Sequence, residues 1–195
     1  MAAGDSLFFP VLGVILSNAL YFSSMPAVLR IARTGHLGKL NVLPQALMVL
    51  STNAWMSYGL SVPNKFIVMS NLPGAIAAVA FISVTLPLIP RADVPSRRAV
   101  QTVLVLGNAA MLLLWVYLIF ADVSHAEKVF LLGAYGSAIC VILFASPLST
   151  MREVIATGNA VSIYAPLTAT QVTNCAMVRA QRDRRLARSG PILSH

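Results

Sequence analysis

Long apolar runs, separated by short polar stretches, constrain this chain more than any other feature. A helix needs about 20 apolar residues to cross a bilayer, and six segments approach that length, the last being short: 7–29, 42–60, 66–89, 100–121, 128–151 and 162–178. Hydrophobic residues make up 57% of the sequence and charged residues 10%, whereas a soluble domain must wet its own surface. The sequence therefore predicts an all-α, multi-pass integral membrane protein.

Charge is concentrated in the loops and in the tail. The net charge of +8 is typical of nucleic-acid binding, but this placement argues against a nucleic-acid partner. The loops after the first, third and fifth segments are the basic ones, with Arg30, Arg33, His36, Lys39, Arg91, Arg97, Arg98 and Arg152. Positive loops stay in the cytoplasm, so the N-terminus is predicted to be extracytoplasmic.

The basic tail at 179–195 breaks this pattern. It carries five arginines, yet six full crossings would place it on the outer side. Either the sixth segment does not cross fully, or the chain lacks a final helix.

An internal repeat divides the chain. The first copy contains Ser24-Met25-Pro26, Thr34-Gly35, Pro44 and Asn53, and the second contains Ser146-Pro147-Leu148, Thr157-Gly158, Pro166 and Asn174. An odd number of helices per repeat plus one linker helix gives two parallel repeats. We expect a first three-helix repeat at 1–90, a linker helix at 91–125, an incomplete second repeat at 126–178 and the basic tail at 179–195.

Four prolines occupy matched places in the two repeats. Pro26 and Pro44 stand 18 residues apart, and Pro147 and Pro166 stand 19 apart. Proline removes a backbone hydrogen bond and kinks a helix, so these positions are predicted to be hinges for a rocking motion. Static packing kinks are the alternative.

With this order of motifs, the chain resembles the SWEET sugar transporters from about residue 10 to 177. The matching stretches, besides those of the repeat, are Ser51-Thr52-Asn53-Ala54-Trp55-Met56-Ser57-Tyr58-Gly59, Asn71-Leu72-Pro73-Gly74, Val154-Ile155-Ala156-Thr157 and Tyr164-Ala165-Pro166-Leu167-Thr168. The resemblance implies two three-helix units joined by a linker helix (3+1+3), with the seventh helix missing here. It also implies bidirectional uniport of a mono- or disaccharide by alternating access, in the plasma membrane or alternatively in the Golgi or another endomembrane, with the four prolines as hinges.

The resemblance also implies a sugar site in the middle of the membrane, formed by Ser51, Trp55 and Asn71. An indole offers a flat apolar face and one N–H, and an amide offers a donor and an acceptor, which suits a sugar. Ser51 and Trp55 are four residues apart and share a helix face. A tryptophan is also a common interfacial anchor, and an intramembrane asparagine often joins helices.

The second repeat departs from the family pattern at its end. Val178 stands where the tryptophan should recur, and the basic tail follows at once. We interpret this change as a truncated or spliced product or an imperfect gene model, with a natural tail as the alternative. The chain could then be a non-transporting truncated isoform or an interaction subunit; a related carrier of amino acids or pyruvate is a third hypothesis.

No motif indicates an enzyme, a cofactor or a metal site. The histidines lie far apart, and Cys140 and Cys175 are interpreted as small apolar packing residues. The acidic residues lie in or near loops, which favours a uniporter over an ion-coupled pump. The predicted partners are a sugar and the lipid bilayer; homo-oligomerisation and the identity of the sugar stay open.

Overall fold

The computed structural model describes residues 3–157 except 39 and 92, and side chains over 7–143. This part of the chain consists of helices and the loops between them, without a strand. Its helices are α1 (Ala3–Phe22), α2 (Met25–Thr34), α3 (Leu43–Ser61), α4 (Lys65–Thr85), the short 3-10 helix η1 (Leu86–Leu88), α5 (Val94–Phe120) and α6 (His125–Thr157). The prediction of an all-α membrane protein is confirmed, whereas the predicted sixth segment, Pro166 and the basic tail lie outside the described residues.

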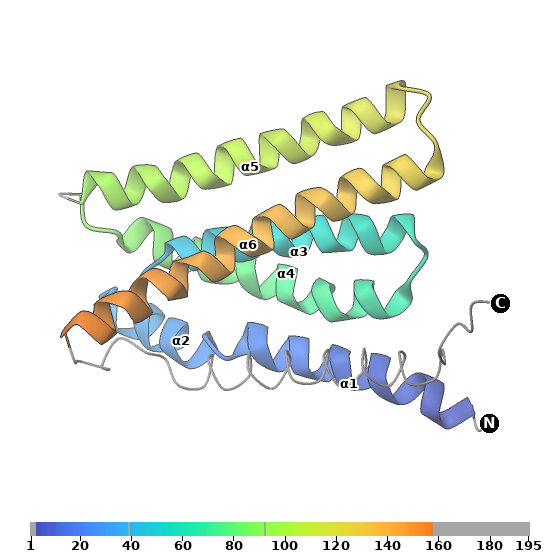
Figure 1. Cartoon of the computed structure of the whole chain (residues 1–195). Coiled ribbons are helices and arrows are strands. Elements are labelled where there is room, and N and C mark those ends of the chain that lie inside the picture. The colour runs from blue at the N-terminus through green and yellow to red at the C-terminus, as the bar shows by residue number, and fades with distance from the viewer. Residues whose placement is uncertain (1–2, 39, 92, 158–195) are drawn as a thin grey trace.

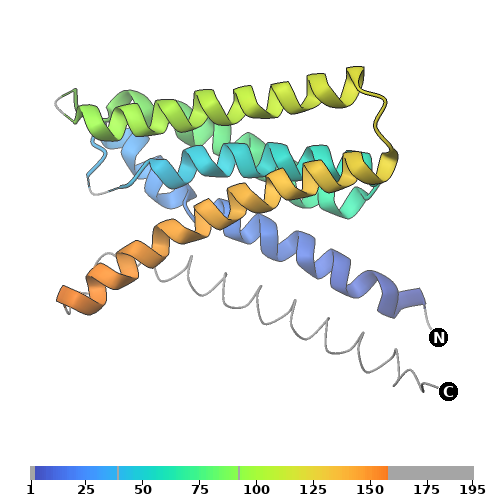
Figure 2. The same ribbon diagram turned by 45° about the horizontal axis from the view of Figure 1, so that its top comes forward.

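Helix α3 lies at the centre of an elongated bundle (Figures 1 and 2). It packs against α4, α5 and α6, while α1 and α2 pack against α4. Four stretches of the described part are long and apolar enough to cross a membrane: Leu7–Thr34, Lys65–Leu88, Val94–Phe120 and His125–Leu143. Helix α3 occupies the predicted second span, although it is not among these four.

The first predicted span is two helices rather than one. Helix α1 ends at Phe22 and α2 begins at Met25, with Pro26 in the first turn of α2. Proline lacks an N–H and its ring clashes with the carbonyl four residues earlier, here that of Phe22, whereas the first turn of a helix needs no such N–H. Pro26 therefore starts a new helix instead of kinking a continuous one.

Pro44 has the same position in α3, because it lies in the first turn of that helix. Pro10 and Pro73 are the prolines found inside α1 and α4, and Pro147 falls within the bounds of α6. The matched prolines of the first repeat thus mark helix starts. Whether they act as hinges stays a prediction.

Side-chain caps determine where α4 and α5 begin. The Asn64 side chain accepts hydrogen bonds from the N–H groups of Phe66 and Ile67, and Asp93 accepts one from the N–H of Ser96 at 3.2 Å. Such caps satisfy N–H groups that have no partner within the helix. Helix α5 accordingly begins at Val94, six residues before the predicted start at 100.

Two glycines allow close contact between helices. A Cβ atom at Gly74 of α4 would overlap the Tyr21 ring of α1, and one at Gly107 of α5 would overlap the Leu50 side chain of α3. Small residues let membrane helices approach closely, where they gain van der Waals contact. These two contacts connect α1 to α4 and α5 to α3.

Charge is distributed unevenly between the two ends of the bundle. The end of α2 and the start of α5 lie at one end, and the α3–α4 and α5–α6 loops lie at the other (Figure 1). The first end carries the arginines Arg30, Arg33, Arg91, Arg97 and Arg98. The opposite end carries Lys65, Asp122, Glu127 and Lys128.

Candidate substrate site

Ser51 and Trp55 meet at one atom of a neighbouring helix. The Trp55 indole N–H donates a hydrogen bond to Cys140 Sγ at 3.1 Å, and Ser51 Oγ lies 3.4 Å from the same sulfur. Both side chains point from α3 toward α6 because positions four apart share one helix face. The four-residue spacing seen in the sequence therefore brings Ser51 and Trp55 to the same sulfur atom.

The Trp55 ring lies against the backbone of α6. A Cβ atom at the buried Gly136 would stand 3.4 Å from Trp55 Cε2. The indole also meets the Tyr58 ring edge-to-face, with centroids 5.5 Å apart and an interplanar angle of 80°. These contacts place the indole between α3 and α6.

Asn71 lies one helix away and is fully hydrogen-bonded. Its carbonyl oxygen accepts a hydrogen bond from the Tyr21 hydroxyl at 2.8 Å. Its amide nitrogen donates to the Ile67 carbonyl at 2.8 Å and to Ser70 Oγ at 3.3 Å. Asn71 is 7% exposed, so a sugar would have to replace the Tyr21 hydroxyl to reach the oxygen.

The three predicted residues fall into two separate groups, Ser51 and Trp55 around Cys140 and Asn71 beside Tyr21. Within the described residues, no hydrogen bond joins Asn71 to Ser51 or Trp55. The two groups lie on neighbouring helices, Ser51 and Trp55 on α3 and Asn71 on α4, and these two helices pack against each other. We call these five residues the polar cluster: Tyr21, Ser51, Trp55, Asn71 and Cys140.

The sequence did not single out Tyr21 or Cys140. Tyr21 lies 50 residues from its partner Asn71, and Cys140 lies 85 residues from Trp55. Tyr21 lies in an apolar run, and Cys140 was interpreted as an apolar packing residue. The identification of Cys140 as a hydrogen-bond acceptor corrects that interpretation.

The polar cluster is uncharged and chemically mixed. It combines two hydroxyls, an amide, a thiol and an indole, which together supply donors, acceptors and an apolar ring face. Sugar hydroxyls and C–H faces match such groups. Neutral hydrogen bonds contribute only about 0.5–1.5 kcal/mol each in net terms, so these groups can hold a solute without trapping it.

Three comparisons with known proteins show what this chain is similar to. Residues 7–90 match the family model described as "Sugar efflux transporter for intercellular exchange". The chain is 27% identical over 155 residues to the bidirectional sugar transporter SWEET16 of Oryza sativa subsp. japonica, covering 80% of this chain and 47% of that protein.

Two further relatives show similar identity. SWEET2a of Oryza sativa subsp. indica is 28% identical over 147 residues, which cover 75% of this chain and 60% of the relative. SWEET11 of Arabidopsis thaliana is 28% identical over 154 residues, which cover 76% of this chain and 51% of the relative. The chain thus spans about half the length of the curated relatives it matches.

The fold has a counterpart among solved structures. A eukaryotic SWEET transporter superposes with a TM-score of 0.71 at 22% sequence identity, covering 88% of this chain and 80% of the other. At this identity the match supports the helical fold.

Proposed function

We propose that this chain belongs to the SWEET family and mediates facilitated transport of a sugar, a mono- or disaccharide, across a membrane; its similarity to bidirectional sugar transporters supports this proposal. Transport would run in either direction by alternating access, without ion coupling. The acidic residues of the described part support the absence of coupling. Asp93, Asp122 and Glu127 lie at helix ends or in loops, Asp5 lies in the first turn of α1, and Glu153 lies near the end of α6. A coupling acid would be expected within a span.

The observation that carries this proposal is the meeting of Ser51 and Trp55 with Cys140. Helix α3 belongs to the predicted first repeat, and α6 opens the predicted second repeat. A polar contact between the two repeats is where a parallel-repeat carrier is expected to hold its substrate. We therefore assign Ser51, Trp55 and Asn71 to substrate binding, with Tyr21 and Cys140 beside them.

The prolines keep their proposed role as hinges. Pro26 stands directly after the break between α1 and α2, where two helices rather than one make up the first span. Pro44 begins α3, and Pro147 and Pro166 are the corresponding positions of the second repeat. Rotation at such helix starts would change the relative tilt of α2 and α3.

We propose a plasma-membrane location with the basic end of the bundle in the cytoplasm and the N-terminus outside. The clustering of Arg30, Arg33, Arg97 and Arg98 at one end supports this orientation.

The experiment is uptake of radiolabelled glucose and sucrose by a sugar-transport-deficient cell that expresses this chain. Asn71→Ala and Trp55→Ala should each lower uptake about tenfold, as expected for the loss of one substrate contact. Two residues of α5 provide matched controls. Asn108 is exposed and bonds only to Leu104 of its own helix, and Trp115 donates to Ser57, so Asn108→Ala and Trp115→Ala should leave uptake near the parent level.

The same experiment distinguishes transport from an interaction role. An inserted chain that takes up neither sugar, yet alters uptake by a co-expressed full-length family member, would contradict transport by this chain and support the subunit alternative. Equal loss of uptake in the α3–α4 variants and in their α5 controls would contradict the assignment of the site.

A further inference from the structure

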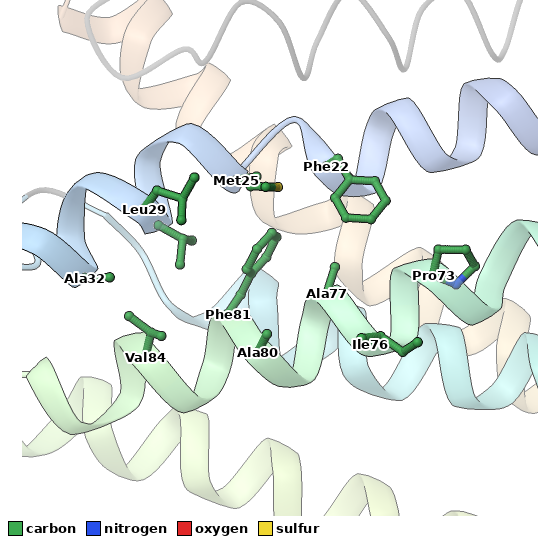
Figure 3. A pocket seen from close by; sticks show the side chains of 11 residues that line it. Phe22, Met25, Leu29, Ala32, Pro73, Ile76, Ala77, Ala80, Phe81 and Val84 are labelled. Carbon is green, nitrogen blue, oxygen red and sulfur yellow. The ribbon is translucent and has the colours of Figure 1, made fainter.

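An apolar groove of about 400 Å³ runs between α2 and α4. Met25 and Leu29 line it from α2, and Ala77 and Phe81 line it from α4 (Figure 3). Phe22, at the end of α1, extends the lining toward the break between α1 and α2. The groove belongs to a different surface from the polar cluster, because no residue of that cluster lines it.

Small side chains and the helix break together produce this groove. Ala32, Ala77 and Ala80 leave room where larger residues would fill the contact between the helices. The lining is almost wholly apolar and remains open to the surface. Met25, Leu29 and Ile76 are exposed at 39%, 45% and 67%, so the described chain leaves the groove uncovered.

One end of the groove is basic. Ala32 and Val84 lie at one end, and Pro73 and Ile76 lie toward the other (Figure 3). Arg33 follows Leu29 by four residues on the same helix face, so it stands about 6 Å beyond that residue along the helix axis. Arg30 and Arg33 are both exposed, and neither forms an ion pair with a described residue.

We propose that this groove binds an acyl chain of an anionic phospholipid, with the lipid phosphate beside Arg33 and Arg30. A linear apolar chain fits a groove that is apolar along its length and positively charged just past one end. Guanidinium groups pair with phosphate oxygens through two parallel hydrogen bonds. Each basic residue near a membrane surface strengthens binding of an anionic lipid about fivefold, which distinguishes this lipid from a zwitterionic one.

Native mass spectrometry of the whole chain, purified in mixed micelles with equimolar phosphatidylglycerol and phosphatidylcholine, tests the proposal. The parent chain should retain phosphatidylglycerol in preference to phosphatidylcholine. Arg33→Gln and Arg30→Gln should each lower that preference about fivefold, and Arg33→Lys should keep most of it. Arg98→Gln, which removes an exposed arginine at the start of α5, is the matched control and should leave the preference for phosphatidylglycerol unchanged.

A second variant tests the groove itself. Ala80 is exposed, and Ala80→Trp places a large ring in the groove, which should reduce retention of both lipids. Ala109→Trp adds the same ring to an exposed position of α5 and should not reduce retention of either lipid. Equal retention of both lipids by the parent would overturn the proposal. So would unchanged retention in Ala80→Trp together with an altered oligomeric mass, which would indicate that a second copy covers the groove.

Discussion

Helices α3 and α5 differ in both composition and environment. Helix α3 contains buried polar residues, Gln45, Ser51 and Thr52, and has neighbours in α4, α5 and α6. Helix α5 is one of the stretches apolar enough to cross a membrane, while α3 is not. Yet α5 buries only Val100, Met111 and Leu118 among its residues.

The more polar helix is thus enclosed and the more apolar helix is exposed, the reverse of a soluble bundle. Leu106, Leu113 and Phe120 of α5 are exposed at 63%, 68% and 84%. In water such a surface would be a liability, but in a bilayer it is the solvent-facing side. Helix α3 can carry polar groups because its neighbours shield them and supply partners to some of their polar atoms, as the bond from Thr85 Oγ1 to Gln45 Oε1 at 2.6 Å illustrates.

Leu106→Arg should have the largest effect, because Leu106 lies near the middle of α5 and faces outward. An arginine at the centre of a spanning helix costs roughly 3 kcal/mol of insertion free energy. Glycosylation acceptor sites in the loops on either side of α5 would report the inserted fraction. Phe120→Arg is the control at the helix end, where the side chain can reach the interface and the cost is small. Equal insertion of both variants would show that this face does not contact lipid.

Ala54→Trp should destabilise the enclosed helix by about 1–3 kcal/mol, since Ala54 is 0% exposed and a large ring forces its neighbours apart. Ala110→Trp, at an exposed position of α5, should change stability by less than about 0.5 kcal/mol. Denaturant titration of helical circular dichroism in detergent micelles would measure both. Similar losses of stability in the two variants would contradict the view that α3 is enclosed and α5 is exposed.

Tyr21→Phe should have the smallest effect, about 0.6 kcal/mol, the average for a side-chain hydrogen bond between membrane helices. The variant removes only the bond from the Tyr21 hydroxyl to Asn71, and the same denaturant titration would detect it. Sugar uptake by Tyr21→Phe and Asn71→Ala then tests whether Asn71 binds sugar. If Asn71 binds sugar, Tyr21→Phe should retain uptake while Asn71→Ala loses it; if Asn71 only joins α1 to α4, both variants should behave alike.

The sequence predicts the helices well because their signal is local. Apolar runs of spanning length located α4, α5 and α6 to within several residues, and the remaining errors arise at caps. Asp93 extends α5 backward to Val94, and the break after Phe22 falls inside an unbroken apolar run. In that run, Pro26 indicates a disturbance without showing whether the helix bends or restarts.

The candidate site is harder to predict because its contacts join distant segments. Ser51 and Trp55 could be paired from helical spacing, and the family resemblance singled out Asn71. The acceptor role of Cys140 depends on how α6 crosses α3, which no local pattern encodes. The same holds for Tyr21, whose hydroxyl meets Asn71 only because α1 packs against α4.

Because Tyr21 packs directly on Gly74, substitutions at these two positions depend on each other. A methyl group at position 74 would occupy the space of the Tyr21 ring, so the size of one side chain limits the size of the other. Among descendants of this sequence, a larger residue at 74 is expected only beside a smaller one at 21. Because Tyr21 also bonds Asn71, a substitution at this glycine would affect Asn71 through the Tyr21 ring, although Asn71 itself is unchanged.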